Sequence, residues 1–222
     1  MDDSGLRLIE GHSLRTLFSV PSAPAPAQGW PVLCFLHGYD EAAPLDIQAA
    51  LTRHGPLSSA SASLAREAFI LVAPQLPAAG DHWHRHAAEV RDLVNRMQEQ
   101  HGGSPRQTYL SGFSFGGNGV FDLAIAQPGT WAALWPVDPT RAPREDPQCP
   151  VWLSFGQAAR KNKSGFVRSL GLQEVGSVAK GERLCLDQGE DHVGSARRAY
   201  ADERIYRWLS SKSLTKPGAS RT

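Results

Sequence analysis

The chain has 222 residues, of which 41% are hydrophobic and 20% charged, and its formal net charge is +1. This length and composition predict one globular domain with a sizeable core, and they exclude a disordered or membrane-spanning protein. Because Lys and Arg are scattered along the chain, the sequence predicts binding neither to nucleic acid nor to a lipid surface.

The first five residues are acidic at positions 2 and 3 and lack the basic-then-apolar pattern of a signal peptide. The three cysteines are Cys34, Cys149 and Cys185. Cys34 and Cys185 lie in apolar runs, which favours buried free thiols over disulfides. We therefore expect a cytoplasmic protein.

Residues 14–20 predict an early strand, placed at or near the edge of a sheet. The continuous apolar runs 31–36 and 69–74 are typical of parallel strands that are covered on both faces. Residues 86–98 carry an apolar stripe at helical spacing. This alternation of strands and helices predicts an α/β fold with a mostly parallel sheet and helices on both faces.

The second half continues the pattern with a helical segment at 120–126 and a final helix near 200–209. Its expected strands are 131–137, 150–155 and 183–186. Only a short proline-rich loop separates the first two of these strands, which leaves no room for a large lid. We expect residues 1–210 to form a single domain and residues 211–222 a flexible C-terminal tail.

The segment Tyr109–Asn118 contains the spacing G-x-S-x-G, with Ser114 between Gly112 and Gly116. An apolar run precedes it and a helical pattern follows it, which is the strand–turn–helix context of a nucleophile elbow. Both glycines would approach neighbouring backbone too closely for a Cβ. The sequence therefore predicts Ser114 as a nucleophile at the start of a helix, where the helix dipole favours an oxyanion.

His37-Gly-Tyr39 follows the strand at 31–36, at the edge of the sheet where ligands bind in open α/β folds. The backbone N–H groups of Tyr39 and Phe115 are the candidate oxyanion donors. The side chains of His37 and Trp83 are the candidate substrate-binding groups. For the imidazole of His37, however, a hydrogen bond within its own loop is the favoured interpretation.

His82, His84 and His86 raise the question of a metal site, because histidines four residues apart on a helix can share one ion. No cysteine or carboxylate completes the ligand set at a suitable spacing, and Asp81 is typical of a helix N-cap. We expect no metal site here, and a polar loop near the mouth of the active site instead.

The chain resembles α/β-hydrolases, in particular the small bacterial esterases of the phospholipase/carboxylesterase and dienelactone-hydrolase type. The stretches that carry this resemblance lie in the family's order at Phe35–Gly38, His54–Pro56, Val72–Pro77 with Trp83, Tyr109–Gly117, Gly189–His192 and Ala199–Leu209. The resemblance implies a Ser–His–acid triad with neither a metal nor an organic cofactor. It also implies that His192 is the catalytic base.

The acid departs from the family's pattern. Related hydrolases usually carry an Asp about three residues past the glycine that ends the seventh strand, but Ala159 stands there, after Gly156. Asp138, at the end of the strand that follows the elbow helix, is the first candidate replacement, although an Asp-Pro turn explains it equally well. Weaker candidates are Asp187, Glu190 and Asp191, and a Ser–His dyad stays open.

The sequence thus predicts a serine hydrolase that cleaves carboxylic esters of small or short-chain substrates through an acyl-enzyme. Its expected partner is a small-molecule ester. Two alternatives stay open. One is a non-catalytic α/β-hydrolase scaffold that binds a ligand, and the other is a thioesterase, lactonase or acyltransferase that uses the same Ser–His pair.

Overall fold

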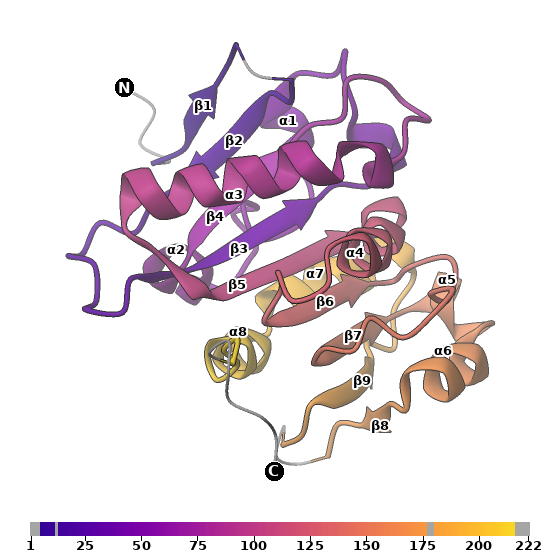
Figure 1. The fold of residues 1–222 in the computed structure, drawn as a ribbon. Coiled ribbons are helices and arrows are strands. Elements are labelled where there is room, and N and C mark those ends of the chain that lie inside the picture. Colours follow the sequence, from indigo (N-terminus) through magenta and orange to yellow (C-terminus); the bar gives the residue numbers. More distant parts are fainter. Residues whose placement is uncertain (1–4, 12, 177–179, 216–222) are drawn as a thin grey trace.

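A computed structural model describes residues 5–11, 13–176 and 180–215 (Figure 1). A twisted sheet of nine strands runs through this part of the chain, in the order β1-β2-β4-β3-β5-β6-β7-β9-β8. The strands are β1 (Arg7–Ile9), β2 (Thr16–Ser19), β3 (Trp30–Leu36), β4 (Ile70–Pro74), β5 (Gly103–Phe113), β6 (Ala133–Val137), β7 (Val151–Phe155), β8 (Gln173–Glu174) and β9 (Arg183–Asp187).

Helices join most of these strands, as the alternating sequence pattern predicts. The α-helices are α1 (Ile47–Leu51), α2 (Leu64–Ala68), α3 (Ala87–His101), α4 (Phe115–Ala126), α5 (Gln157–Arg160), α6 (Lys163–Leu170), α7 (His192–Ala201) and α8 (Glu203–Ser210). Two 3-10 helices, η1 (Tyr39–Glu41) and η2 (Trp83–His86), follow β3 and precede α3. No helix of the described ranges combines the length and the apolar character that a membrane span needs.

The predicted fold class is confirmed. β3 pairs in parallel with β4 and β5, and the parallel ladder continues through β6, β7 and β9. The strand expected near the edge, β2, pairs antiparallel with β4, but the exposed strand β1 covers its other side. β1 was not predicted, because three residues are too few to show a period.

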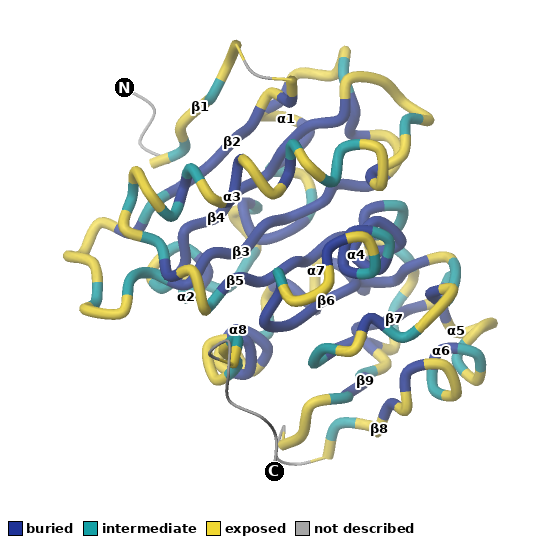
Figure 2. Tube along the Cα trace, viewed as in Figure 1, coloured by how far each residue is buried: buried dark blue, intermediate teal, exposed yellow. Residues whose placement is uncertain are grey.

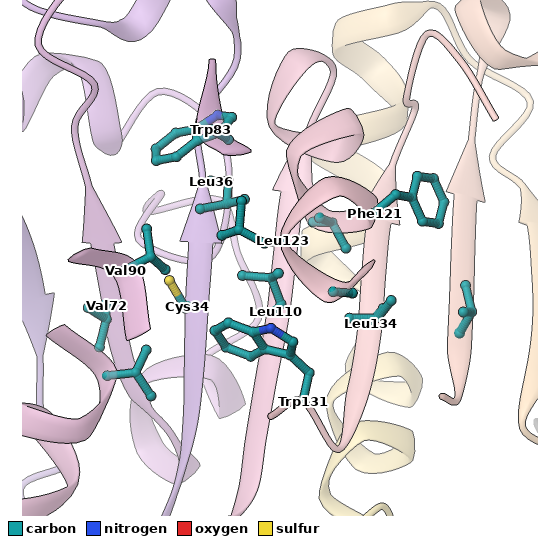
Figure 3. Close-up of a cluster of buried hydrophobic side chains, with 14 of the residues drawn as sticks. Cys34, Leu36, Val72, Trp83, Val90, Leu110, Phe121, Leu123, Trp131 and Leu134 are labelled. Atoms are coloured by element: carbon teal, nitrogen blue, oxygen red, sulfur yellow. The ribbon is translucent and has the colours of Figure 1, made fainter. Parts of the chain in front are cut away.

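Strand residues alternate between two cores, one on each face of the sheet. In β3, the side chains of Val32 and Cys34 belong to the core under α3, α4 and α6, whereas Leu33 and Phe35 belong to the core under α1, α2, α7 and α8. Figure 3 shows part of the first core, with Cys34, Leu110 and Leu123 among its buried side chains. Each fully buried Val, Leu, Ile or Phe side chain of these cores stabilises the fold by about 1.5–3 kcal/mol relative to exposure.

The C-terminal third departs from the sequence expectation. The single helix expected near 200–209 is two helices, α7 and α8, which are separated at Asp202. The carboxylate of Asp202 accepts a hydrogen bond from the N–H of Arg204 and caps α8, so the chain turns there. The short elements α5, α6 and β8 were also not predicted.

We expected a flexible tail from residue 211, but the first residues of this segment pack against the domain. The N–H of Leu214 donates to the carbonyl of Arg106, and the guanidinium of Arg106 donates to the carbonyl of Leu214. These bonds extend the ordered domain past residue 210. The expectation for residues 216–222 lies outside the described residues.

The parallel strands bring four chain segments to one edge of the sheet. β3, β5, β6 and β7 are consecutive neighbours, so the residues that follow them (His37, Ser114, Asp138 and Gly156) emerge side by side. The strands themselves are buried, as the dark blue centre of Figure 2 shows, so this edge has a rigid base. It is the edge at which ligands bind in open α/β sheets.

Candidate active site

Ser114 lies at a tight turn between β5 and α4. Its backbone has a φ of 56°, in the left-handed region, and its N–H donates to the carbonyl of Val137 at 2.9 Å. A Cβ on Gly116 would lie 1.9 Å from the carbonyl oxygen of Leu36, and one on Gly112 would lie 2.4 Å from that of Gly116. The glycines of the motif are therefore required by close backbone contact, and the strained serine is typical of a functional turn.

His192 is the first residue of α7, although the sequence suggested a loop. The helix begins here because the carboxylate of Asp191 accepts the N–H of Gly194 at 2.7 Å and caps it. The imidazole packs on the ring of Phe113, with centroids 4.7 Å apart. Its Nε2 lies 2.8 Å from Oγ of Ser114, across 78 residues of chain.

Asp138 completes a chain of hydrogen bonds with these two residues. Its Oδ2 lies 2.5 Å from Nδ1 of His192. Its Oδ1 accepts the N–H groups of Gly156 and Ala159 at 2.8 and 3.0 Å. The side chain is fully buried, so every contact that holds the carboxylate comes from the protein.

The other candidate acids bind elsewhere. The carboxylate of Asp187 pairs with Arg160 at 2.9 Å, and Glu190 pairs with Arg198 at 2.6 Å. Asp191 is the cap of α7 described above. Asp138 is therefore the carboxylate that the structure brings to His192.

These contacts fix the tautomer of the imidazole. An ionised carboxylate only accepts hydrogen bonds, so the proton of neutral His192 lies on Nδ1, facing Asp138. The lone pair of Nε2 then faces Ser114 Oγ and can accept its proton. This arrangement allows general-base activation of a serine hydroxyl, with the resulting imidazolium stabilised by the buried carboxylate.

The candidate oxyanion donors are the first residues of two helices. Tyr39 begins η1 and Phe115 begins α4, so neither N–H has a partner within its own helix. The two side chains contact each other edge to face, with ring centroids 5.8 Å apart. The elbow and the loop after β3 are thus in contact at the residues whose amides would bind an oxyanion.

The side chain of His37 supports this loop and does not face a ligand. It is fully buried, and its Nε2 accepts the N–H of Leu76 at 2.9 Å. Its proton therefore lies on Nδ1, which donates to the carbonyl of Gly38 at 2.6 Å. Burial lowers the pKa of His37 from 6.5 to about 4. This agrees with the loop hydrogen bond favoured from the sequence and argues against substrate binding by the imidazole.

Trp83 is 1% exposed, so its indole contributes packing rather than an open binding surface. Its Nε1 donates to the carbonyl of His37 at 3.4 Å, and its ring lies 5.0 Å from that of His37. It also forms part of the wall of a cavity of about 590 Å³ beside Phe115. The cavity is lined by both apolar and charged residues of η2, α4 and the loop after β6, namely His82, Trp83, His84, Phe115, Asn118, Gly119, Asp122, Ile125, Ala126, Arg141, Arg144 and Glu145.

The histidines at 82, 84 and 86 do not converge on one point. The ring of His86 bonds Oδ2 of Asp81 at 2.7 Å, while His82 and His84 stack with centroids 5.4 Å apart. Asp81 lies one residue before the cap position of η2 that His82 occupies, so it is not the N-cap expected from the sequence. Across the described residues, no group of three His, Cys, Asp or Glu side chains could hold a metal ion.

Two further groups, which no motif in the sequence singles out, support the site. The amide of Asn118 ties α4 to the loop after Asp138, since its Oδ1 accepts the N–H groups of Thr140 and Arg141 at 3.0 and 3.2 Å. The carboxyl of Glu41 is buried beside the loop after β3. Glu41 makes half of a capping box, since its side chain accepts the N–H of Gly38, but glycine has no side chain to complete the motif, so the sequence carries no cap signal there.

No family model matches the chain, and no curated protein matches it. Among solved structures, it is similar to a thermostable esterase, with 18% identity and a TM-score of 0.73 over 94% of this chain and 63% of that one. The chain therefore spans less than two thirds of that esterase. It is also similar to FphF, a fluorophosphonate-binding serine hydrolase of Staphylococcus aureus (14% identity, TM-score 0.63, 92% and 96% covered).

A third similar structure is the S-formylglutathione hydrolase FrmB of Staphylococcus aureus, with 13% identity and a TM-score of 0.64 over 92% of this chain and 97% of that one. At these identities the likeness concerns the fold. Together with the strand order and the position of the elbow, it establishes that the chain has the α/β-hydrolase fold.

Proposed function

We propose that this protein is a serine hydrolase that cleaves carboxylic esters of small or short-chain substrates through an acyl-enzyme. The observation that carries the proposal is the continuous hydrogen-bonded chain Ser114–His192–Asp138, with distances of 2.8 and 2.5 Å. The three residues are far apart in sequence, and a turn that holds Ser114 in a strained conformation has no evident purely structural use.

In acylation, Oγ of Ser114 attacks the ester carbonyl carbon while Nε2 of His192 takes the hydroxyl proton. The carbonyl oxygen becomes an oxyanion, which the N–H groups of Tyr39 and Phe115 stabilise. When the tetrahedral intermediate collapses, the C–O bond to the alcohol breaks, and His192 gives its proton to the departing oxygen. Ser114 is left as an acyl ester and His192 is neutral again.

Deacylation repeats these steps with water as the nucleophile. Nε2 of His192 takes a proton from water, the hydroxide adds to the acyl carbon, and the returned proton releases Ser114. Asp138 keeps its negative charge throughout and holds the imidazole through Nδ1. No step needs a metal ion or an organic cofactor.

The surroundings of Ser114 support a small substrate. The cavity of about 590 Å³ beside Phe115 is within the usual range for a small-molecule site. A second hollow of about 220 Å³ is lined in part by His54, Val193 and Tyr200, and Val193 directly follows His192 in α7. These two hollows would receive the two parts of an ester divided at the scissile bond.

A cytoplasmic location is part of the proposal and rests on the cysteines. Cys34, Cys149 and Cys185 are free thiols. Burial raises the pKa of the Cys149 thiol to about 12, and it raises the pKa values of Cys34 and Cys185 as well. Thiols that stay protonated are unreactive, which agrees with a protein whose cysteines serve packing.

Covalent labelling tests the proposal. A fluorophosphonate probe should modify the purified protein at Ser114, and Ser114→Ala should abolish both the labelling and the hydrolysis of p-nitrophenyl acetate while the fold is kept. A folded protein that neither labels nor hydrolyses the ester would be the non-catalytic scaffold. A panel that adds thioesters, lactones and acyl acceptors then separates ester hydrolysis from the related reactions.

A further inference from the structure

Glu41 is a buried carboxyl group outside the triad. It is the last residue of η1, and its side chain is only 5% exposed. Burial raises the pKa of this carboxyl, and a group of this kind is retained in a protein interior only with hydrogen-bonding partners. The partners of Glu41 therefore indicate what it does.

The carboxyl holds the peptide that precedes Gly38. Its Oε2 accepts the N–H of Gly38 at 2.5 Å, and its Oε1 lies 3.5 Å from Nε2 of His54. Burial lowers the pKa of His54 to about 4, so this imidazole is neutral near pH 7. The backbone carbonyl of Glu41 in turn accepts the side-chain amide of Gln75 at 3.1 Å, which anchors η1 to the end of β4.

The peptide that follows Gly38 is held from the other side. Its carbonyl accepts Nδ1–H of His37, and its N–H is that of Tyr39, the candidate oxyanion donor. Glu41 and His37 thus fix one peptide plane on each side of Gly38, at φ −73° and ψ −178°. Glycine would otherwise rotate freely about both angles. In a trans peptide, the N–H points opposite to the anchored carbonyl, so both anchors together determine where the Tyr39 N–H points.

We propose that Glu41 is a positioning residue of the oxyanion hole: by holding the N–H of Gly38, its carboxyl keeps the N–H of Tyr39 aimed at the developing oxyanion. This inference rests on the proposed hydrolase function. Glu41 does not touch the substrate in this scheme. Because it acts on an interaction that strengthens in the transition state, its loss lowers kcat rather than raising KM.

Two substitutions separate geometry from charge. Glu41→Gln keeps an acceptor oxygen for the Gly38 N–H but no charge, whereas Glu41→Ala removes the acceptor. With p-nitrophenyl acetate, we expect Glu41→Ala to lower kcat on the order of 10²-fold with KM within about threefold, as for the loss of an oxyanion donor. Glu41→Gln should keep kcat within about fivefold of the wild type, because the hydrogen bond is retained.

Asp46→Ala is the matched control. Asp46 also accepts a backbone N–H, that of Ala49 at 2.9 Å, but it caps α1. This variant should lose stability without a change in kcat. If Glu41→Ala fails to fold, Glu41→Met takes its place, since it fills the volume without offering a hydrogen-bond acceptor.

Three results would overturn the proposal: an unchanged kcat in the folded variant without an acceptor, an equal loss in Glu41→Gln, or an effect confined to KM. A wild-type protein that hydrolyses no ester would instead overturn the proposed function, and the role of Glu41 with it. The wild-type activity therefore distinguishes the two failures.

Discussion

Oδ2 of Asp138 lies 2.5 Å from Nδ1 of His192, although the two residues are separated by 54 positions in the chain. Asp138 follows β6, whereas related hydrolases usually carry their acid after the next strand of the sheet. The strand ends are neighbours, so the carboxylate reaches the same imidazole nitrogen from the adjacent position. A carboxylate thus reaches His192 although none stands at position 159.

Asp138→Asn should lower kcat by about 10³–10⁴-fold. The amide NH2 would donate to Nδ1, so the remaining proton of neutral His192 would move to Nε2, which could then no longer accept the proton of Ser114. Steady-state hydrolysis of p-nitrophenyl acetate measures the effect. Asp187→Asn, which breaks the exposed pair with Arg160, is the control and should leave kcat unchanged. A folded Asp138→Asn protein within tenfold of the wild type would contradict this role.

Gly116→Ala should destabilise the fold by about 3 kcal/mol or more, because the added Cβ would lie 1.9 Å from the carbonyl oxygen of Leu36 and the elbow would have to move. Gly165→Ala is the matched variant, since Gly165 lies in α6 with nothing within 4 Å of the added Cβ. That change should stabilise the protein by about 0.5–1 kcal/mol. Urea denaturation compares the two, and equal stabilities would show that the elbow backbone tolerates a side chain.

The stability of the protein should fall as the pH is lowered from about 6.5 toward 4. Burial lowers the pKa of His37 to about 4, so across this window the unfolded chain binds a proton that the folded one does not. The stabilisation is fully present above pH 6.5, and His37 alone accounts for a loss of about 3 kcal/mol by pH 4. His54 acts in the same direction, and Glu41, whose pKa is raised, acts in the opposite direction.

A variant isolates the contribution of His37. In His37→Gln, the amide oxygen can still accept the N–H of Leu76, but the side chain does not titrate. The free energy of unfolding of this variant should change less between pH 7 and pH 4 than that of the wild type, by about 3 kcal/mol. Parallel pH curves for the two proteins would mean that the buried imidazole is not responsible.

The larger cavity should set the size of the ester that is accepted. Ile125 lines it from α4, and Ile125→Trp would fill part of its volume. We expect kcat/KM for p-nitrophenyl octanoate to fall at least tenfold while that for the acetate stays within about threefold, since each methylene in a pocket contributes about 1 kcal/mol or more. Val193→Trp is the companion variant in the smaller hollow. If only Val193→Trp lowers kcat/KM for the octanoate relative to the acetate, the acyl chain lies in the smaller hollow instead.

Periodicity and motif spacing were sufficient to predict the central strands, the long helix α3 and the elbow. The runs ending at Leu36, Pro74 and Phe155 are continuous and apolar because both of their faces are covered by helices, and such runs are visible in the sequence. The edge strand β1, with its exposed residues, carries no such pattern. The break at Asp202 was missed because the apolar spacing continues across it, and the cap decides where the helix ends.

The residues of the candidate site differ in how far the sequence alone could identify them. Ser114 has a local motif and His192 was identified through the resemblance to a family, whereas the pairing of Asp138 with His192 depends on which strand ends are neighbours. Glu41 was missed because a charged residue in a loop is usually exposed. Its burial follows from the packing of η1 against His54 and Gln75, segments that lie distant in the chain.

The amide of Ala159 points at Oδ1 of Asp138, from the place where related hydrolases carry the acid itself. In this chain the imidazole of His192 is reached from the end of β6, and the end of β7 contributes two backbone donors that hold the carboxylate. Which carboxylate reaches the imidazole is therefore decided by the order of the strands in the sheet, and distance along the chain does not reveal it.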